Sequence, residues 1–157
     1  MPNGDTVIYT RDKAGNVLRE DISKSGKITN TKEFRYDKLS RLIYSNINGM
    51  KREYSYDNIG NLLEVTDAQT NLSLETYTYD SLNRKKTTTN ATGATTQFDY
   101  KFGQLSSVTD PRGLVTSYRY DAYGKLREMN SPDTGKAAYR YNPDGNLSHK
   151  IEGNSSL

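Results

Sequence analysis

The sequence predicts an all-β protein built from tandem β-hairpins, and three observations carry this prediction. Leu, Ile, Val and Phe together number only 28 of the 157 residues, whereas tyrosine occurs 13 times and supplies much of the apolar surface. Threonine and tyrosine favour strands, and asparagine and serine favour turns. An aromatic pair followed by a turn signal recurs every 20 to 23 residues. A fixed period of this length is typical of repeat architectures.

The composition also excludes several classes of protein. The chain has no cysteine, so disulfide frameworks and zinc–thiolate sites are excluded. No apolar stretch reaches the roughly 18 residues of a membrane-spanning helix, and the first residues lack the apolar segment of a signal peptide, so we expect no membrane insertion. The net charge of +3 is small and scattered along the chain. We therefore expect no nucleic-acid partner.

The repeats keep register over nearly the whole chain. The second aromatic of each pair stands at positions 36, 56, 79, 100, 120 and 141, and a degenerate copy begins at Tyr9. We expect about seven repeats over residues 1–150 and a polar tail at 151–157. The predicted repeats lie near residues 7–31, 32–52, 53–75, 76–96, 97–116, 117–137 and 138–150.

The first strand of each repeat carries the aromatic pair. Its two rings lie two residues apart and share one face of a strand, and an apolar residue opens the second strand after the turn. A single hairpin cannot bury this face, but stacked copies can. The predicted structural core is Tyr36, Tyr54, Tyr56, Tyr77, Tyr79, Phe98, Tyr100, Tyr118, Tyr120, Tyr139 and Tyr141 with Leu42, Leu62, Leu105, Leu126 and Leu147. For a core aromatic, Tyr120→Ala is expected to cost about 3–5 kcal/mol.

The turns follow the pattern Asp-x-x-Gly. An aspartate at the first position accepts hydrogen bonds from the backbone ahead of it, and a glycine at the fourth allows the positive φ of a bulged hairpin. One copy, around Phe102, lacks the aspartate and is one residue short. The predicted turn residues are Asp37, Asp57, Gly60, Asp80, Gly103, Asp110, Pro111, Gly113, Asp121, Gly124, Asn142, Pro143 and Gly145.

This pattern resembles the Rhs or YD-repeat family, with Tyr-x-Tyr-Asp-x-x-Gly-Asn-Leu at residues 54–62 as its clearest copy. The resemblance implies a curved antiparallel β-ribbon that is a fragment of a hollow spiral shell. Bacterial members are polymorphic toxins, toxin-complex components and wall-associated proteins, and teneurins have a similar barrel. The resemblance thus implies a secreted or cell-surface protein whose partners are further YD repeats of the same parent and an enclosed C-terminal toxin domain.

From this resemblance we expect a non-catalytic structural segment. Seven repeats are too few to close a shell, so the chain is expected to be a fragment of a longer protein or, as the alternative, a decayed or orphan remnant. Asp110-Pro111-Arg112-Gly113 is similar to a self-cleavage motif of bacterial shells, but it lies inside the array, so an ordinary turn is expected. The alternative is a module whose tyrosine rows bind carbohydrate, such as cell-surface or wall glycans.

Other chemistry has little support in the sequence. His149 is the only histidine, and no Gly-x-Ser-x-Gly motif accompanies it, so we expect a surface residue. The recurring aspartates 12, 37, 57, 80 and 121 offer mostly one carboxylate per turn, whereas calcium takes about six to eight oxygens. No phosphate-binding loop is present. We therefore expect no catalytic residue, no metal and no cofactor.

Overall fold

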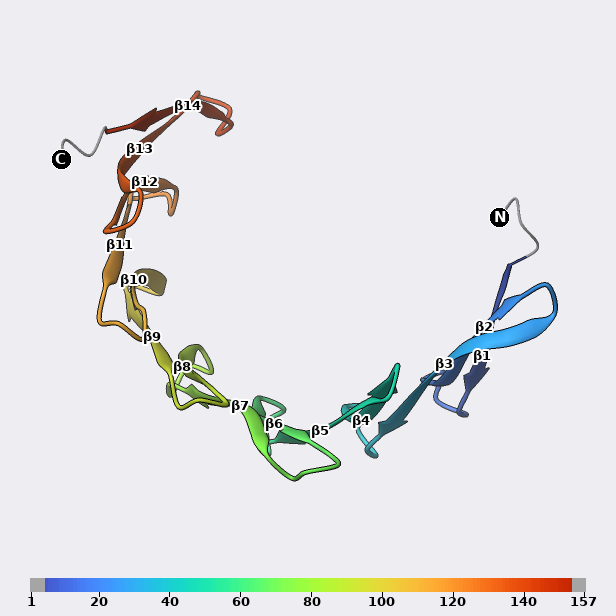
Figure 1. Cartoon of the computed structure of the whole chain (residues 1–157). Coiled ribbons are helices and arrows are strands. Elements are labelled where there is room, and N and C mark those ends of the chain that lie inside the picture. The colour runs from blue at the N-terminus through green and yellow to red at the C-terminus, as the bar shows by residue number, and fades with distance from the viewer. Residues whose placement is uncertain (1–4, 154–157) are drawn as a thin grey trace. The chain divides into compact units, whose positions relative to one another are not determined.

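The computed structural model describes residues 5–153, and all regular structure in this range is β-strand. The hydrogen-bonding order of the 14 strands is their order along the chain (Figure 1), and the described pairs are antiparallel. The all-β prediction is confirmed. The strands are β1 (Thr6–Arg11), β2 (Val17–Lys24), β3 (Lys27–Tyr36), β4 (Leu42–Ile47), β5 (Met50–Tyr56), β6 (Leu62–Asp67), β7 (Ser73–Tyr79), β8 (Lys85–Asn90), β9 (Thr95–Lys101), β10 (Gln104–Thr109), β11 (Val115–Tyr120), β12 (Leu126–Ser131), β13 (Gly135–Tyr141) and β14 (Leu147–Glu152).

The chain divides into two compact units, an N-terminal unit of residues 1–77 and a C-terminal unit of residues 78–157. Within each unit the described strands form a meander one layer thick. The only buried hydrophobic side chains among the described residues are therefore Val65 in the first unit and Ala137 in the second. A sheet without a covering layer leaves large side chains partly in water, and every tyrosine and phenylalanine predicted as core is half-buried.

The strand register pairs the predicted aromatics with the predicted leucines. Each pair joins an aromatic residue at the end of the strand before a turn to a leucine at the start of the strand after it. Aromatic–aliphatic pairs directly across a ladder stabilise a sheet. A bulge precedes the aromatic in most of these hairpins, so the strand twists as it enters the turn. The pairs are Tyr36↔Leu42, Tyr56↔Leu62, Tyr100↔Leu105, Tyr120↔Leu126 and Tyr141↔Leu147.

The C-terminal end differs from the sequence-based expectation. Leu147, predicted as core, is 55% exposed. It lies on β14, the last strand, which is paired on one edge only and is exposed along its whole length. Residues 151 and 152 continue this strand instead of opening the polar tail. Residues 154–157 of the predicted tail lie outside the described residues.

Candidate functional site

The aspartate turns, which begin at Asp12, Asp37, Asp57, Asp80, Asp121 and Asn142, share one geometry. In the third of them, the N–H of Gly60 donates to the carbonyl oxygen of Asp57 at 3.2 Å, and the N–H of Asp57 donates to the carbonyl oxygen of Asn61 at 2.9 Å. The carboxylate oxygen Oδ1 of Asp57 accepts the N–H groups of Ile59 and Asn61 at 3.0 and 2.8 Å. The carboxylate thus satisfies backbone donors that the turn would leave unpaired.

The fourth position of these turns requires a positive φ. Gly60, Gly124 and Gly145 have φ values of 99°, 81° and 89°, and Gly113 has 83° in the turn after Asp110. Ser40 and Asn83 hold the same position with φ values of 59° and 60°. Pro111 and Pro143 follow Asp110 and Asn142 at the second turn position, where the fixed φ of proline suits a type I turn. Gly103, at φ 82°, belongs to the short turn and follows Phe102.

Arginine reinforces two of the turn carboxylates. The backbone N–H of Arg41, and then its side chain, lower the pKa of Asp37 against the opposing effect of burial. The pKa of Asp80 is lowered first by the side chain and then by the backbone N–H of Arg84. Both carboxylates are therefore charged at neutral pH and are occupied by donors within their own turn. Among residues 5–153, no three potential ligands gather in a way that would hold a metal ion.

A ladder of tyrosine hydroxyls joins consecutive hairpins. Tyr56 donates to the carbonyl oxygen of Leu42 at 2.8 Å, 14 residues earlier in the chain. Tyr100 and Tyr141 make the same bond to the carbonyl oxygens of Lys85 and Leu126, at 3.0 and 2.9 Å. The three acceptors hold one repeat position, the first strand residue after an aspartate turn. In these three repeats the second tyrosine therefore fastens its own hairpin to the preceding one.

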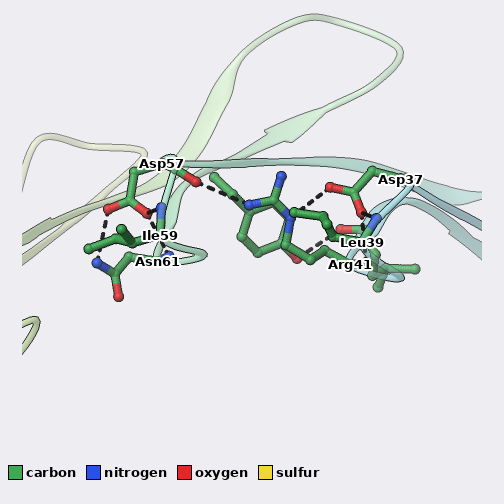
Figure 2. Close-up of polar contacts among 8 residues, drawn as sticks. Asp37, Leu39, Arg41, Asp57, Ile59 and Asn61 are labelled. Carbon is green, nitrogen blue, oxygen red and sulfur yellow. Dashed lines mark hydrogen bonds and ion pairs between the residues drawn. The ribbon is translucent and has the colours of Figure 1, made fainter.

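A cation from the preceding turn covers the same tyrosine ring. The guanidinium carbon of Arg41 lies 4.9 Å from the ring centroid of Tyr56, and its Nη1 donates to the carbonyl oxygen of Asp57 at 3.0 Å. Figure 2 shows Arg41 reaching from the Asp37 turn to the Asp57 turn. Such contacts are worth about 0.5–1 kcal/mol at exposed sites.

The same contact recurs in the C-terminal unit. Arg84 lies 4.3 Å from the ring centroid of Tyr100, and the ammonium of Lys125 lies 5.4 Å from that of Tyr141. Sequence reasoning missed these cations. The signal that reveals them is their place, four residues after the turn aspartate.

The other predicted aromatics lie on the same strands without forming a separate site. The hydroxyls of Tyr54 and Ser45 are 3.1 Å apart, and the hydroxyl of Tyr77 donates to Glu75. The remaining half-buried aromatics are Tyr36, Tyr79, Phe98, Tyr118, Tyr120 and Tyr139.

His149 lies exposed on β14, with its Nδ1 3.1 Å from the hydroxyl of Ser148. The described part of the chain contains no helix that is long and apolar enough to cross a membrane.

Comparison with known proteins decides the family. The family model described as "RHS Repeat" matches residues 56–96 and 98–136, which together make up half of the chain. The chain belongs to the RHS repeat family. A curated relative, the tRNA nuclease WapA of Bacillus subtilis (strain 168), is 26% identical over 150 residues, a match that spans 88% of this chain and 6% of the relative.

Solved structures of much longer proteins contain the same fold. The crystal structure of TcdB2-TccC3-Cdc42 matches 88% of this chain with a TM-score of 0.71 and 14% identity, over 9% of its own length. The Photorhabdus luminescens Tc holotoxin pore matches 88% of this chain with a TM-score of 0.70 and 15% identity, over 8% of its length. The RHS chain therefore has the fold of a stretch of these much longer proteins.

Proposed function

We propose that this RHS chain is a structural segment of a longer secreted or cell-surface protein and that it has no catalytic activity of its own. Its role is to form wall, together with further repeats of the same parent, around a toxin or effector domain elsewhere in the polypeptide. The tRNA nuclease relative supports this division of labour, because the present chain corresponds to only 6% of its length. The match to 8–9% of the Tc toxin chains supports the same proposal.

The observation that carries the proposal is the ladder between hairpins. The hydroxyls of Tyr56, Tyr100 and Tyr141 each bond to a neighbouring hairpin, and a cation covers each of their rings. The hydroxyl groups and ring faces of these tyrosines are thus engaged in contacts between neighbouring hairpins. An element whose repeated groups bind each other is suited to extend a wall.

The same ladder disfavours the carbohydrate-binding alternative for these tyrosines. Stacking against a sugar needs an open ring face, and in Tyr56, Tyr100 and Tyr141 a guanidinium or ammonium group lies over the ring. Their hydroxyls are also bonded to backbone carbonyls and are not free to contact a glycan. The structural role therefore accounts for more of the repeated residues than glycan binding does.

The test begins with the reading frame on both sides of this segment in the source genome. Further repeats of the same kind, leading into an unrelated domain, are expected. The intact polypeptide is then purified and digested with a protease, and digestion of the unrelated domain is followed in time. We expect that domain to be protected, and to become cleavable when Tyr56→Ala weakens the wall.

Lys38→Ala is the matched control, because Lys38 is an exposed residue of an aspartate turn and takes no part in the ladder. Protection should survive this change. A flanking sequence without repeats would overturn the proposal. So would a domain that is digested at the same rate in the wild-type protein and the Tyr56→Ala variant.

A further inference from the structure

A groove of about 820 Å³ lies in the C-terminal unit beside the short turn between β9 and β10. Residues 101–106 form one side, and residues 118–124 of β11 and the Asp121 turn form the other. We call it the Phe102 groove. The short turn has one residue fewer than the aspartate turns. Gln104 holds the place before the strand leucine that Arg41 and Lys125 hold in their repeats.

Phe102 combines a strained backbone conformation with a side chain that is fully exposed to solvent. Its φ is 50°, and the other non-glycine residues with positive φ among those described are serines and asparagines. A left-handed conformation costs a bulky residue about 1–2 kcal/mol. The side chain is nevertheless fully exposed, at 102%. A strained backbone that holds an aromatic side chain in solvent points to a functional contact.

The opposite rim of the groove carries a second exposed aromatic and a carboxylate. Tyr123 is 89% exposed. The Oδ1 atom of Asp121 accepts the N–H groups of Tyr123 and Lys125 at 2.9 Å, whereas Oδ2 has no partner among the residues that the structure describes. In the Asp37 and Asp80 turns, Oδ2 is bound by Arg41 and Arg84.

The pKa of Asp121 is lowered, chiefly by the N–H of Lys125 and also by that of Tyr123, with contributions from the charges of Arg127 and Lys125. Its carboxylate is therefore ionised at neutral pH.

Among the described residues, no cation lies over the tyrosine rings that line the Phe102 groove. An arginine or lysine lies over the rings of Tyr44, Tyr56, Tyr100 and Tyr141, but Tyr118, Tyr120 and Tyr123 have no such partner within residues 5–153. Lys101 and Arg119 also line the groove. Side chains alternate along a strand, which directs Arg119 away from the ring of its strand neighbour Tyr118.

We propose that the Phe102 groove binds the arginine side chain of a separate polypeptide segment. The guanidinium group would lie against the aromatic rings of Phe102 and Tyr123 and donate to the free carboxylate oxygen of Asp121. Arginine fits better than lysine because its planar group both stacks on rings and presents paired donors to a carboxylate. Aromatic residues and arginine are also the groups most enriched at protein interfaces. This binding does not depend on the wall-forming role.

The test uses the complete chain and a glycine–serine peptide with one central arginine. Binding is followed by the amide NMR shifts of Gly103 and Gly124, with a citrulline peptide as the neutral isostere. We expect saturable shifts with the arginine peptide only. Phe102→Gly should weaken binding about two- to fivefold, the effect of losing one cation–π contact. Because glycine suits a positive φ, this variant should fold at least as well as the wild-type chain.

Two further variants complete the test. Asp121→Asn keeps an acceptor for the turn and removes the charge, and it should weaken binding as well. Leu82→Ala removes a side chain that is 68% exposed at the tip of another aspartate turn, away from the groove, and should leave binding unchanged. Equal binding of the citrulline peptide, an unchanged affinity in Phe102→Gly, or no saturable shift at about 20 mM peptide would each refute the proposal.

Discussion

Removal of one tyrosine hydroxyl tests whether the ladder stabilises the ribbon. In Tyr56→Phe the ring stays beneath Arg41, and only the 2.8 Å hydrogen bond to the carbonyl oxygen of Leu42 is lost. A net contribution of about 1 kcal/mol is expected for such a bond. For a chain of this size, that loss corresponds to a decrease in Tm of about 2–4 °C.

The assay is urea unfolding followed by tyrosine fluorescence, together with native-state hydrogen exchange. Exchange should accelerate in β4 and β5, the strands that Tyr56 and Leu42 belong to, because stability in a repeat array is transmitted between neighbours. Tyr123→Phe is the control. Tyr123 is 89% exposed, and a surface change of this kind should stay within about 0.5 kcal/mol. Equal effects of the two substitutions would show that the ladder bond adds nothing to stability.

Four further outcomes follow from the structure. Tyr120→Ala should lower the free energy of unfolding in urea by about 1–2 kcal/mol, less than the roughly 3–5 kcal/mol expected for a core residue, because Tyr120 is only half-buried. A loss above about 3 kcal/mol would mean that another surface covers its ring. Gly60→Ala should cost about 1 kcal/mol from its φ of 99° alone, since a Cβ there meets no atom within 4 Å, and an unchanged stability would contradict this strain. Asp37 and Asp80 should contribute their full share to the free energy of unfolding above the unfolded-state pKa of aspartate, about 3.9, and lose it as the pH falls through their lowered pKa values. A free energy of unfolding that does not change with pH in acid would refute this. The chain should form concentration-dependent oligomers through β1 and β14, the open edges of the strand order, and sedimentation showing a stable monomer at high concentration would count against it.

The fold could be predicted from the sequence because strand and turn signals recur together at a regular spacing of about 21 residues. Alternation in Tyr54-Ser-Tyr56 predicts a strand face, and Asp57 followed by Gly60 predicts the turn that ends it. The depth of burial could not be predicted in the same way. Whether a tyrosine is covered by a second layer depends on which other segments pack against the sheet, and the repeat pattern does not contain that information. Leu147 is exposed because its strand, β14, has a neighbouring strand on one side only.

The groups that join one hairpin to the next were harder to find than the hairpins. Arg41 looks like an ordinary charged residue in the sequence, yet it contacts its own turn, the next turn and a tyrosine ring. The contacts with the next turn and with the ring arise only when two hairpins lie side by side, so the position of Arg41 four residues after Asp37 becomes informative only once the hairpin pairing is known. Phe102 was recognised as a departure from the repeat, but its strain and full exposure required the backbone geometry.

The order of strands has a consequence for how such a chain is made and how it changes. Because each strand bonds only to the strands before and after it in the chain, a hairpin has all its partners once the next repeat has been synthesised. Folding can therefore proceed from one end as the polypeptide emerges from a ribosome or a secretion channel, without waiting for distant segments. For the same reason, duplication or deletion of a whole repeat of about 21 residues alters the length of the ribbon and leaves every other pairing intact.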